Sequence, residues 1–112
     1  MTARSFMTVT ASTKRNATDG NRRITAEPYL AGLLITPLWP VGQETIRLLD
    51  LNSPRKMREA FHVPATGDAL PDVQERDILV VDGDEYPVDF VGTWQDGAIP
   101  TLHIVVGEVI AT

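Results

Sequence analysis

The feature that most restricts the fold is a regular alternation of apolar and polar side chains behind a turn dipeptide. The stretch DILVVDGDEYPVDFVGTW, residues 77–94, contains Asp82-Gly83. This pair is a strong signal for a two-residue β-hairpin, because glycine accepts the positive φ angle that the turn requires. The apolar side chains that follow recur at every second position, as in a strand with one buried face, so we expect the alternating apolar residues to turn inward together. The residues expected to build this hairpin are Asp82, Gly83, Tyr86, Val88, Phe90 and Trp94.

Other apolar segments predict further strands. Residues 29–36 and 46–51 are short apolar runs, and Pro37 ends the first of them because proline cannot donate to a strand ladder. In the last strand, residues 101–109, the side chain of His103 has the opposite parity from its apolar neighbours. We therefore expect His103 at the surface or at an interface.

A helix start is indicated by Ser53-Pro54, in which serine can cap the helix and proline suits its first position. Met57, Ala60 and Phe61 then share one face at helical spacing, which predicts a short helix near 54–61. The predicted fold class is mainly β: a small antiparallel β-barrel of the SH3 or OB type, with one short helix and an extended N-terminal arm or hairpin.

The chain of 112 residues suits one domain, which we divide into an N-terminal segment, 1–27, and a barrel, 28–112. A turn signal at Asp19-Gly20-Asn21 could make residues 5–12 and 22–27 a hairpin, but the segment could equally be an arm that a partner orders. Its five basic side chains against two acidic ones suit a tail that is solvated or that seeks an interface, and Trp39 between two prolines could lie in the core or at an interface. The candidate subunit or ring interface residues are Arg4, Lys14, Arg15, Arg22, Arg23 and Trp39.

The net charge of −5 conceals an acidic block, because residues 68–96 hold nine acidic side chains against Arg76 alone. Such a block repels nucleic acid. Part of it lies in the segment 63–77, which has the composition of a loop and is long for a domain of this size. Long loops tend to be functional, and the candidate channel-loop residues are Asp68, Asp72 and Glu75.

No pattern in the sequence indicates catalysis or a cofactor. Cysteine is absent, which excludes thiolate chemistry. The acidic stretch that begins at Asp82 has Pro87 where a calcium loop needs glycine, so its carboxylates are expected to face solvent instead of a metal. The two histidines are not spaced as the ligands of a metal site are, and no serine lies in a nucleophile motif. No apolar run approaches the roughly 20 residues of a membrane span, and the N-terminus lacks the apolar core of a secretory signal. We therefore predict no catalytic residue, no metal, no cofactor and no enzyme activity.

The segments LLITPLWPV, IRLLDLNSPRKMREAFHV, RDILVVDGDEYPVDFVGTW and LHIVVGEV together resemble the head-closure proteins of long-tailed bacteriophages, also called stopper, head-completion or head–tail connector proteins. The family signature resembles GD-x-L-x-V-D-G-x-x-Y-x-V-x-x-V-x-x-W, and the resemblance covers about residues 29–109. Two positions depart from the pattern: Arg76 stands where a glycine is usual, and Trp39 where a small or acidic residue is expected. The residues that occupy the signature are Asp77, Leu79, Val81, Asp82, Gly83, Tyr86, Val88, Val91 and Trp94.

The resemblance implies a structural protein of the virion neck, made in the host cytoplasm and without catalytic activity. Its members form a ring, dodecameric or hexameric, between the portal or adaptor and the tail. The ring closes the capsid channel, retains DNA, docks the tail and opens for ejection, and DNA passes without sequence-specific binding. We expect the loop 63–77 to face the channel. The alternatives are a tail-terminator or tail-completion subunit, a free-standing SH3- or OB-like binding module, or a small enzyme whose pocket would gather two polar side chains between apolar walls.

Overall fold

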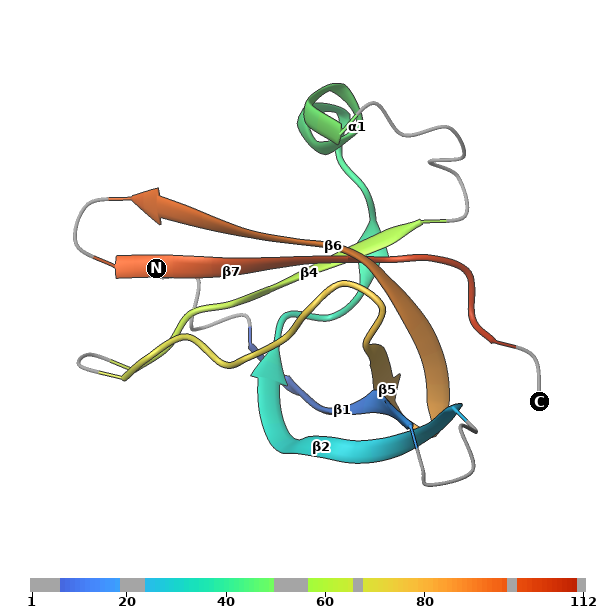
Figure 1. The fold of residues 1–112 in the computed structure, drawn as a ribbon. Coiled ribbons are helices and arrows are strands. Elements are labelled where there is room, and N and C mark those ends of the chain that lie inside the picture. Colours follow the sequence, from blue (N-terminus) through green and yellow to red (C-terminus); the bar gives the residue numbers. More distant parts are fainter. Residues whose placement is uncertain (1–6, 19–23, 50–56, 66–67, 97–98, 111–112) are drawn as a thin grey trace.

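The computed structural model describes residues 7–18, 24–49, 57–65, 68–96 and 99–110. These residues form one sheet of seven antiparallel strands and one short helix, α1 (Gln43–Leu49), so the predicted mainly β class is confirmed (Figure 1). The strand order across the sheet is β2-β1-β5-β6-β7-β4-β3. The strands are β1 (Val9–Thr18), β2 (Ile24–Ile35), β3 (Trp39–Pro40), β4 (Arg58–His62), β5 (Ile78–Val81), β6 (Asp84–Asp96) and β7 (Ile99–Val106).

The sheet is strongly curled. Strands β2 and β3 are its two edges, yet only residues 36–38 separate them in the chain. Four peptide steps reach about 14 Å at most, so the two edges must lie near each other. Thr36 joins the end of β2 to β4, the strand that pairs with β3, because its backbone N–H donates to the carbonyl of Phe61 at 3.0 Å and its hydroxyl accepts from the Phe61 N–H at 2.9 Å. The strand ladder itself does not close.

The hairpin has its turn where the sequence predicts it. Asp82 and Gly83 have φ angles of 51° and 84°, and Val81 pairs with Asp84 across the two-residue turn. Two consecutive positive φ angles are typical of the type I′ turn, which matches the twist of the strands that it joins.

The prediction that Val88, Phe90 and Trp94 turn inward together is wrong beyond Val88. Val88 is 2% exposed, whereas Trp94 is 45% exposed. The reason is a register shift between Val88 and Phe90, which is a β-bulge. A bulge adds one residue and reverses the parity after it, so Val91 takes the inward place opposite Ile104. Phe90 and Trp94 lie on the other face of the sheet.

The predicted helix near 54–61 is also wrong. Residues Arg58–His62 form β4, and every one of them pairs with β7. Packing between β7 and β3 overrides the local helical pattern, because Ala60 gains complete burial in the sheet. Ser53-Pro54, the predicted helix start, lies outside the described residues. The helix is instead at Gln43–Leu49, which overlaps the strand predicted over 46–51, and it carries Glu44 in its first turn and Arg47 in its last, as the helix dipole favours.

The described part of the N-terminal segment lies in the sheet. β1 pairs with β2 from Val9 opposite Ile35 to Thr18 opposite Ile24, and its middle part, from Ala11 to Lys14, also pairs with β5. Of the two predicted alternatives, the structure therefore has a hairpin, with strands that extend well beyond 5–12 and 22–27. Arg4, Arg22 and Arg23 lie outside the described residues.

The core fills the inside of the curled sheet, but β7 is buried on both of its faces. Leu102, Ile104 and Val106 face the main core, which β1, β2, β4, β5 and β6 complete. On the opposite face His103 and Val105 are also buried, at 1% and 0% exposure. The helix α1 lies on this outer side of β4, β6 and β7, so the sheet carries a second, smaller layer there (Figure 1).

Candidate functional site

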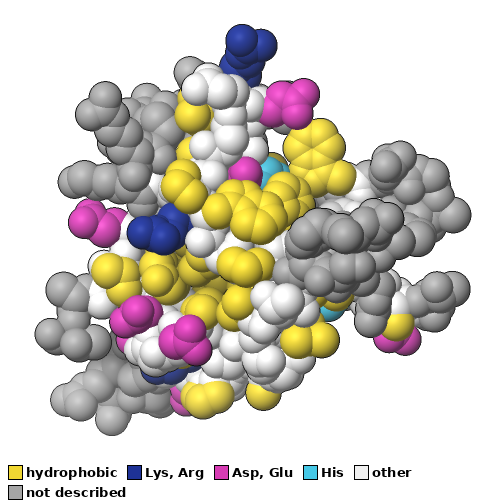
Figure 2. Space-filling model, turned by 180° about the vertical axis from the view of Figure 1, so that it is seen from behind, with side chains coloured by type: hydrophobic (Ala, Val, Ile, Leu, Met, Phe, Trp, Pro, Cys, Tyr) yellow, Lys and Arg dark blue, Asp and Glu magenta, His cyan; other side chains and the backbone are white. Residues whose placement is uncertain are grey.

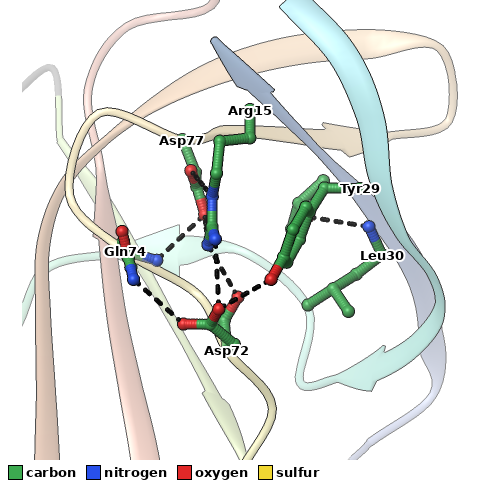
Figure 3. A network of polar contacts seen from close by, with 7 residues as sticks. Arg15, Tyr29, Leu30, Asp72, Gln74 and Asp77 are labelled. Atoms are coloured by element: carbon green, nitrogen blue, oxygen red, sulfur yellow. Dashed lines mark hydrogen bonds and ion pairs between the residues drawn. The ribbon is translucent and has the colours of Figure 1, made fainter. Parts of the chain in front are cut away.

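Arg15, on β1, forms a two-point ion pair with Asp77, which lies just before β5. Its Nε atom donates to Asp77 Oδ1 at 2.9 Å, and its Nη2 atom donates to Asp77 Oδ2 at 2.9 Å (Figure 3). The Asp77 side chain is only 3% exposed, and the Gln74 N–H donates to the same carboxylate at 2.9 Å. Two parallel hydrogen bonds of this kind give a strong and directional pair.

The same guanidinium also binds Asp72 of the loop 63–77. Arg15 Nη1 donates to Asp72 Oδ2 at 3.0 Å, and the Tyr29 hydroxyl donates to that oxygen at 2.8 Å. The guanidinium carbon lies 3.7 Å from the centre of the Tyr29 ring, which adds a cation–π contact. Hydrogen bonds from Arg15 and Tyr29 hold the pKa of Asp72 below its ordinary value, and those to Asp77 and Asp72 raise the pKa of Arg15.

These contacts change the interpretation of two candidate residues. The sequence predicts Arg15 at a subunit interface and Asp72 in a channel loop, whereas in the structure they bind each other and hold the loop against β1 and β2. Lys14 is likewise paired within the chain, with Glu85 at 2.6 Å. Asp68 and Glu75 are exposed. Segment 63–77 has no strand or helix among its described residues, yet it packs on the sheet through buried Val73.

A second polar network is centred on Glu59 of β4, which is 5% exposed. Its Oε1 atom accepts hydrogen bonds from Trp39 Nε1 at 3.3 Å and from the Gly42 N–H at 3.1 Å. Its Oε2 atom accepts from the Thr45 hydroxyl at 2.6 Å and lies 2.8 Å from His103 Nε2. Burial by itself would raise the pKa of Glu59, but the bonds from Thr45, His103 and Gly42 together lower it below its ordinary value.

His103 connects this carboxylate to Trp94. The Trp94 Nε1–H donates to His103 Nδ1 at 3.0 Å. Since an indole nitrogen can only donate, His103 Nδ1 must be an unprotonated acceptor, and the ring proton is on Nε2, where it faces Glu59. The buried imidazole is therefore the neutral Nε2–H tautomer. The prediction that His103 lies at the surface or at an interface is wrong, because His103 is 1% exposed and lies under the start of α1, whose Thr45 binds the same Glu59 oxygen.

Aromatic rings surround the network. Phe61 stacks on His103 with 4.5 Å between ring centres and an angle of 8°, and Phe90 meets His103 edge-on at 6.1 Å. Trp39 lies 6.1 Å from Phe61 and is 37% exposed. Figure 2 shows one face of the molecule, on which hydrophobic side chains form a broad patch with a histidine and an acidic side chain beside it.

A pocket of about 480 Å³ opens between the start of α1 and strands β4, β6 and β7. Glu59 and His103 supply polar groups, and Phe61 and Trp94 supply apolar walls. This is the kind of pocket that would favour a small enzyme or a binding module. Both nitrogens of His103 and both oxygens of Glu59 are already engaged, and the indole N–H of Trp94 stands where a triad would present its nucleophile. The geometry thus supplies no free acid, base or nucleophile in this network.

Sequence reasoning missed the Glu59 network because Glu59 falls within the predicted helix 54–61, off the face that Met57, Ala60 and Phe61 share. One signal was available: Val105 has the same parity as His103, and an apolar side chain on the expected wet face indicates that this face is covered too. As for the acidic stretch, no group of three or more histidine or acidic side chains within the described ranges could hold a metal ion.

Comparison with models of known protein families, with characterised proteins and with solved structures found no match to this chain. In the part of the chain that the structure describes, no helix has the length and apolar character needed to cross a membrane.

Proposed function

We propose that this protein is a structural, non-catalytic subunit of a phage neck, similar to head-closure proteins. Copies of the chain form a ring between the portal or adaptor and the tail, where the ring closes the channel, retains DNA and docks the tail. Within this proposal the curled sheet is a partly open barrel, with Thr36 joining β2 to β4 where the strand ladder is interrupted.

The observation that carries the proposal is the backbone at Arg76. The head-closure pattern has a glycine at this place, and Arg76 has a φ angle of 76°. This is the left-handed region, which glycine adopts at low cost and which costs other residues about 1–2 kcal/mol. The chain thus departs from the pattern in residue type but keeps the conformation that the pattern's glycine favours. The turn at Asp82 and Gly83 lies at the corresponding place of the pattern.

Exposed apolar side chains further support assembly. They gather mainly near the edges and ends of the sheet, where a neighbouring copy would cover them. A mainly apolar groove of about 300 Å³ also lies between residues 30–34 of β2 and described residues that follow β4, among them Pro64, Ala69 and Pro71. Within the described part of the chain, the large exposed apolar residues are Tyr29, Leu34, Trp39, Trp94, Val109 and Ile110.

Asp68, Asp72 and Glu75, the residues of the proposed channel surface, are all exposed, and Asp72 also pairs with Arg15. Carboxylates at a channel surface would repel the phosphates of DNA, so DNA could pass without being held.

The experiment combines the isolated chain with the particle. The recombinant chain, studied by native mass spectrometry and negative-stain electron microscopy, is expected to form closed rings. A reconstruction of the neck in purified particles of the virus that encodes it should place the chain between the portal and the tail rings. A position at the tail end of the neck would favour a tail-terminator or tail-completion subunit. A chain that stays monomeric at high concentration and is missing from the particles would refute the proposal.

The pocket beside Glu59 and His103 favours a second candidate, a free-standing binding module. Such a module would be monomeric and would bind its ligand at full affinity without assembly. The oligomeric state of the ligand-bound chain therefore separates the two functions.

A further inference from the structure

We propose that the pocket between α1 and the outer face of β4 and β7 binds the cationic group of an arginine or lysine side chain from a protein partner. The pocket holds a buried negative charge that neutral groups alone compensate, and aromatic rings form its walls. This site goes beyond the ring proposal, since it would bind such a side chain whether or not the chain assembles.

The charge of the pocket follows from the directions of its hydrogen bonds. The Trp94 indole donates to His103 Nδ1, so His103 is neutral and contributes no positive charge. Glu59 accepts hydrogen bonds from four donors, which occupy all the lone-pair sites of a carboxylate and leave no place for a proton. Glu59 is therefore ionised, and its partners are a hydroxyl, an amide, an indole and a neutral imidazole.

No described residue that lines the pocket is basic. Glu44, in the first turn of α1, adds a second carboxylate at the rim, and it has neither a hydrogen bond nor an ion pair within the described ranges. A cation that enters the pocket would thus meet a rim carboxylate that is free to bind it directly. It would also lie in the field of Glu59, which is screened little because that carboxylate is out of water.

The walls suit an organic cation with an apolar stem. Phe61 and Trp94 line the pocket, and aromatic faces attract guanidinium and ammonium groups. The volume of about 480 Å³ falls in the ordinary range for ligand pockets, so it accepts a whole side chain with its methylene groups.

The surroundings favour a protein partner over a free amine. Trp94 and Trp39 are 45% and 37% exposed, and both bond to the same network, Trp94 through His103 and Trp39 through Glu59. Tryptophan and arginine dominate the centres of protein interfaces, where a side chain from one partner fills a pocket of the other. The two exposed indoles would be covered when the partner's basic side chain enters.

The test uses the full chain and three small probes. N-acetyl-arginine amide represents an arginine within a protein, its citrulline analogue is a neutral mimic of the same shape, and agmatine represents a free amine. We expect N-acetyl-arginine amide to shift the Trp94 indole resonance in a saturable manner by NMR. The citrulline analogue should bind at least roughly tenfold more weakly than N-acetyl-arginine amide, because it lacks the positive charge.

Two variants locate the site. Glu44→Gln removes the rim charge, makes no change to a hydrogen bond of the network, and is expected to weaken binding of N-acetyl-arginine amide about threefold. Glu75→Gln, which removes an exposed carboxylate far along the chain, should leave binding unchanged. Equal binding of the arginine and citrulline probes, or no saturable shift of the Trp94 resonance, would overturn the proposal. Binding of agmatine without binding of the capped arginine would overturn its assignment to a protein partner.

Discussion

The guanidinium of Arg15 forms two hydrogen bonds, both 2.9 Å long, with the buried carboxylate of Asp77, which lies 62 positions further along the chain. This contact joins the first strand to the end of the acidic loop, and Asp72 and Tyr29 complete it from either side (Figure 3). In this chain, which has no disulfide, Arg15 therefore holds the loop 63–77 against β1.

The first prediction concerns this arginine. Arg15→Ala leaves the Asp77 carboxylate buried without its counter-charge, so it should lower the free energy of unfolding by about 3 kcal/mol. Lys14→Ala, at the neighbouring position, removes a more exposed pair with Glu85 and should cost less than about 1 kcal/mol. Urea denaturation measures both variants. An equal decrease in the free energy of unfolding in the two variants would show that the buried pair stabilises the protein no more than the exposed pair does.

The backbone at Arg76 gives the second prediction. Arg76→Gly removes the cost of a left-handed conformation in an arginine, which exceeds the entropy that glycine adds to the unfolded chain. We expect the variant to be as stable as the wild type or more stable by up to about 1 kcal/mol. Glu75→Gly, at a neighbour with ordinary φ, should destabilise by about 0.5 kcal/mol. Thermal unfolding that ranks the two variants in the reverse order would contradict the backbone argument.

The third prediction is that stability falls at acid pH in part because Glu59 becomes protonated. Its pKa lies below the ordinary value of 4.5, so the native state holds this proton less tightly than the unfolded state does. The stabilisation is therefore complete above about pH 4.5 and is lost as the pH falls through the native pKa. Urea denaturation between neutral pH and acid should show a shallower decline for Glu59→Gln than for the wild type.

The same variant has an effect at neutral pH. The Glu59→Gln side chain has an N–H donor where the carboxylate accepted hydrogen bonds, and this donor faces groups that themselves donate. The free energy of unfolding should therefore fall by about 2 kcal/mol. Asp72→Asn serves as a control, since the lowered pKa of Asp72 contributes separately and Glu59 keeps its own acid response in that variant. If stability falls with pH as steeply in Glu59→Gln as in the wild type, Glu59 does not cause the acid dependence.

The fourth prediction concerns the proton on His103. Nitrogen-15 NMR at neutral pH should show a protonated Nε2 and an unprotonated Nδ1, because the Trp94 indole donates to Nδ1. Trp94→Phe removes that donor and should shift the Nδ1 resonance while the fold is retained. Observation of the Nδ1–H tautomer in the wild type would be incompatible with the network, and with the negative pocket inferred from it.

The fifth prediction tests how Phe90 packs after the bulge. A Cβ atom added at Gly92 would lie 2.8 Å from two ring atoms of Phe90, so Gly92→Ala should destabilise the protein by about 1–3 kcal/mol. Phe90→Leu in the same chain removes the ring and should recover part of the loss. A strictly additive double variant would show that the two residues do not meet.

Local sequence patterns alone specify the class of this fold and the place of its clearest turn. Alternation with a period of two indicates strands wherever they pair, and the conformational demands of Asp82-Gly83 are local, so both could be read without knowledge of any partner strand. The absence of cysteine likewise decided that no disulfide supports the chain.

Long-range packing of the strands sets which side chains are buried after the bulge, where the helix lies and which polar groups meet. One extra residue in β6 reversed the parity that placed Trp94 inside, and pairing with β7 turned the helical pattern at Ala60 into a strand. The contacts of Arg15 with Asp77 and of Glu59 with His103 join residues 62 and 44 positions apart. Local propensity carries no information about such distances, because the free energy of these contacts arises from burial and pairing that exist only once the sheet has curled.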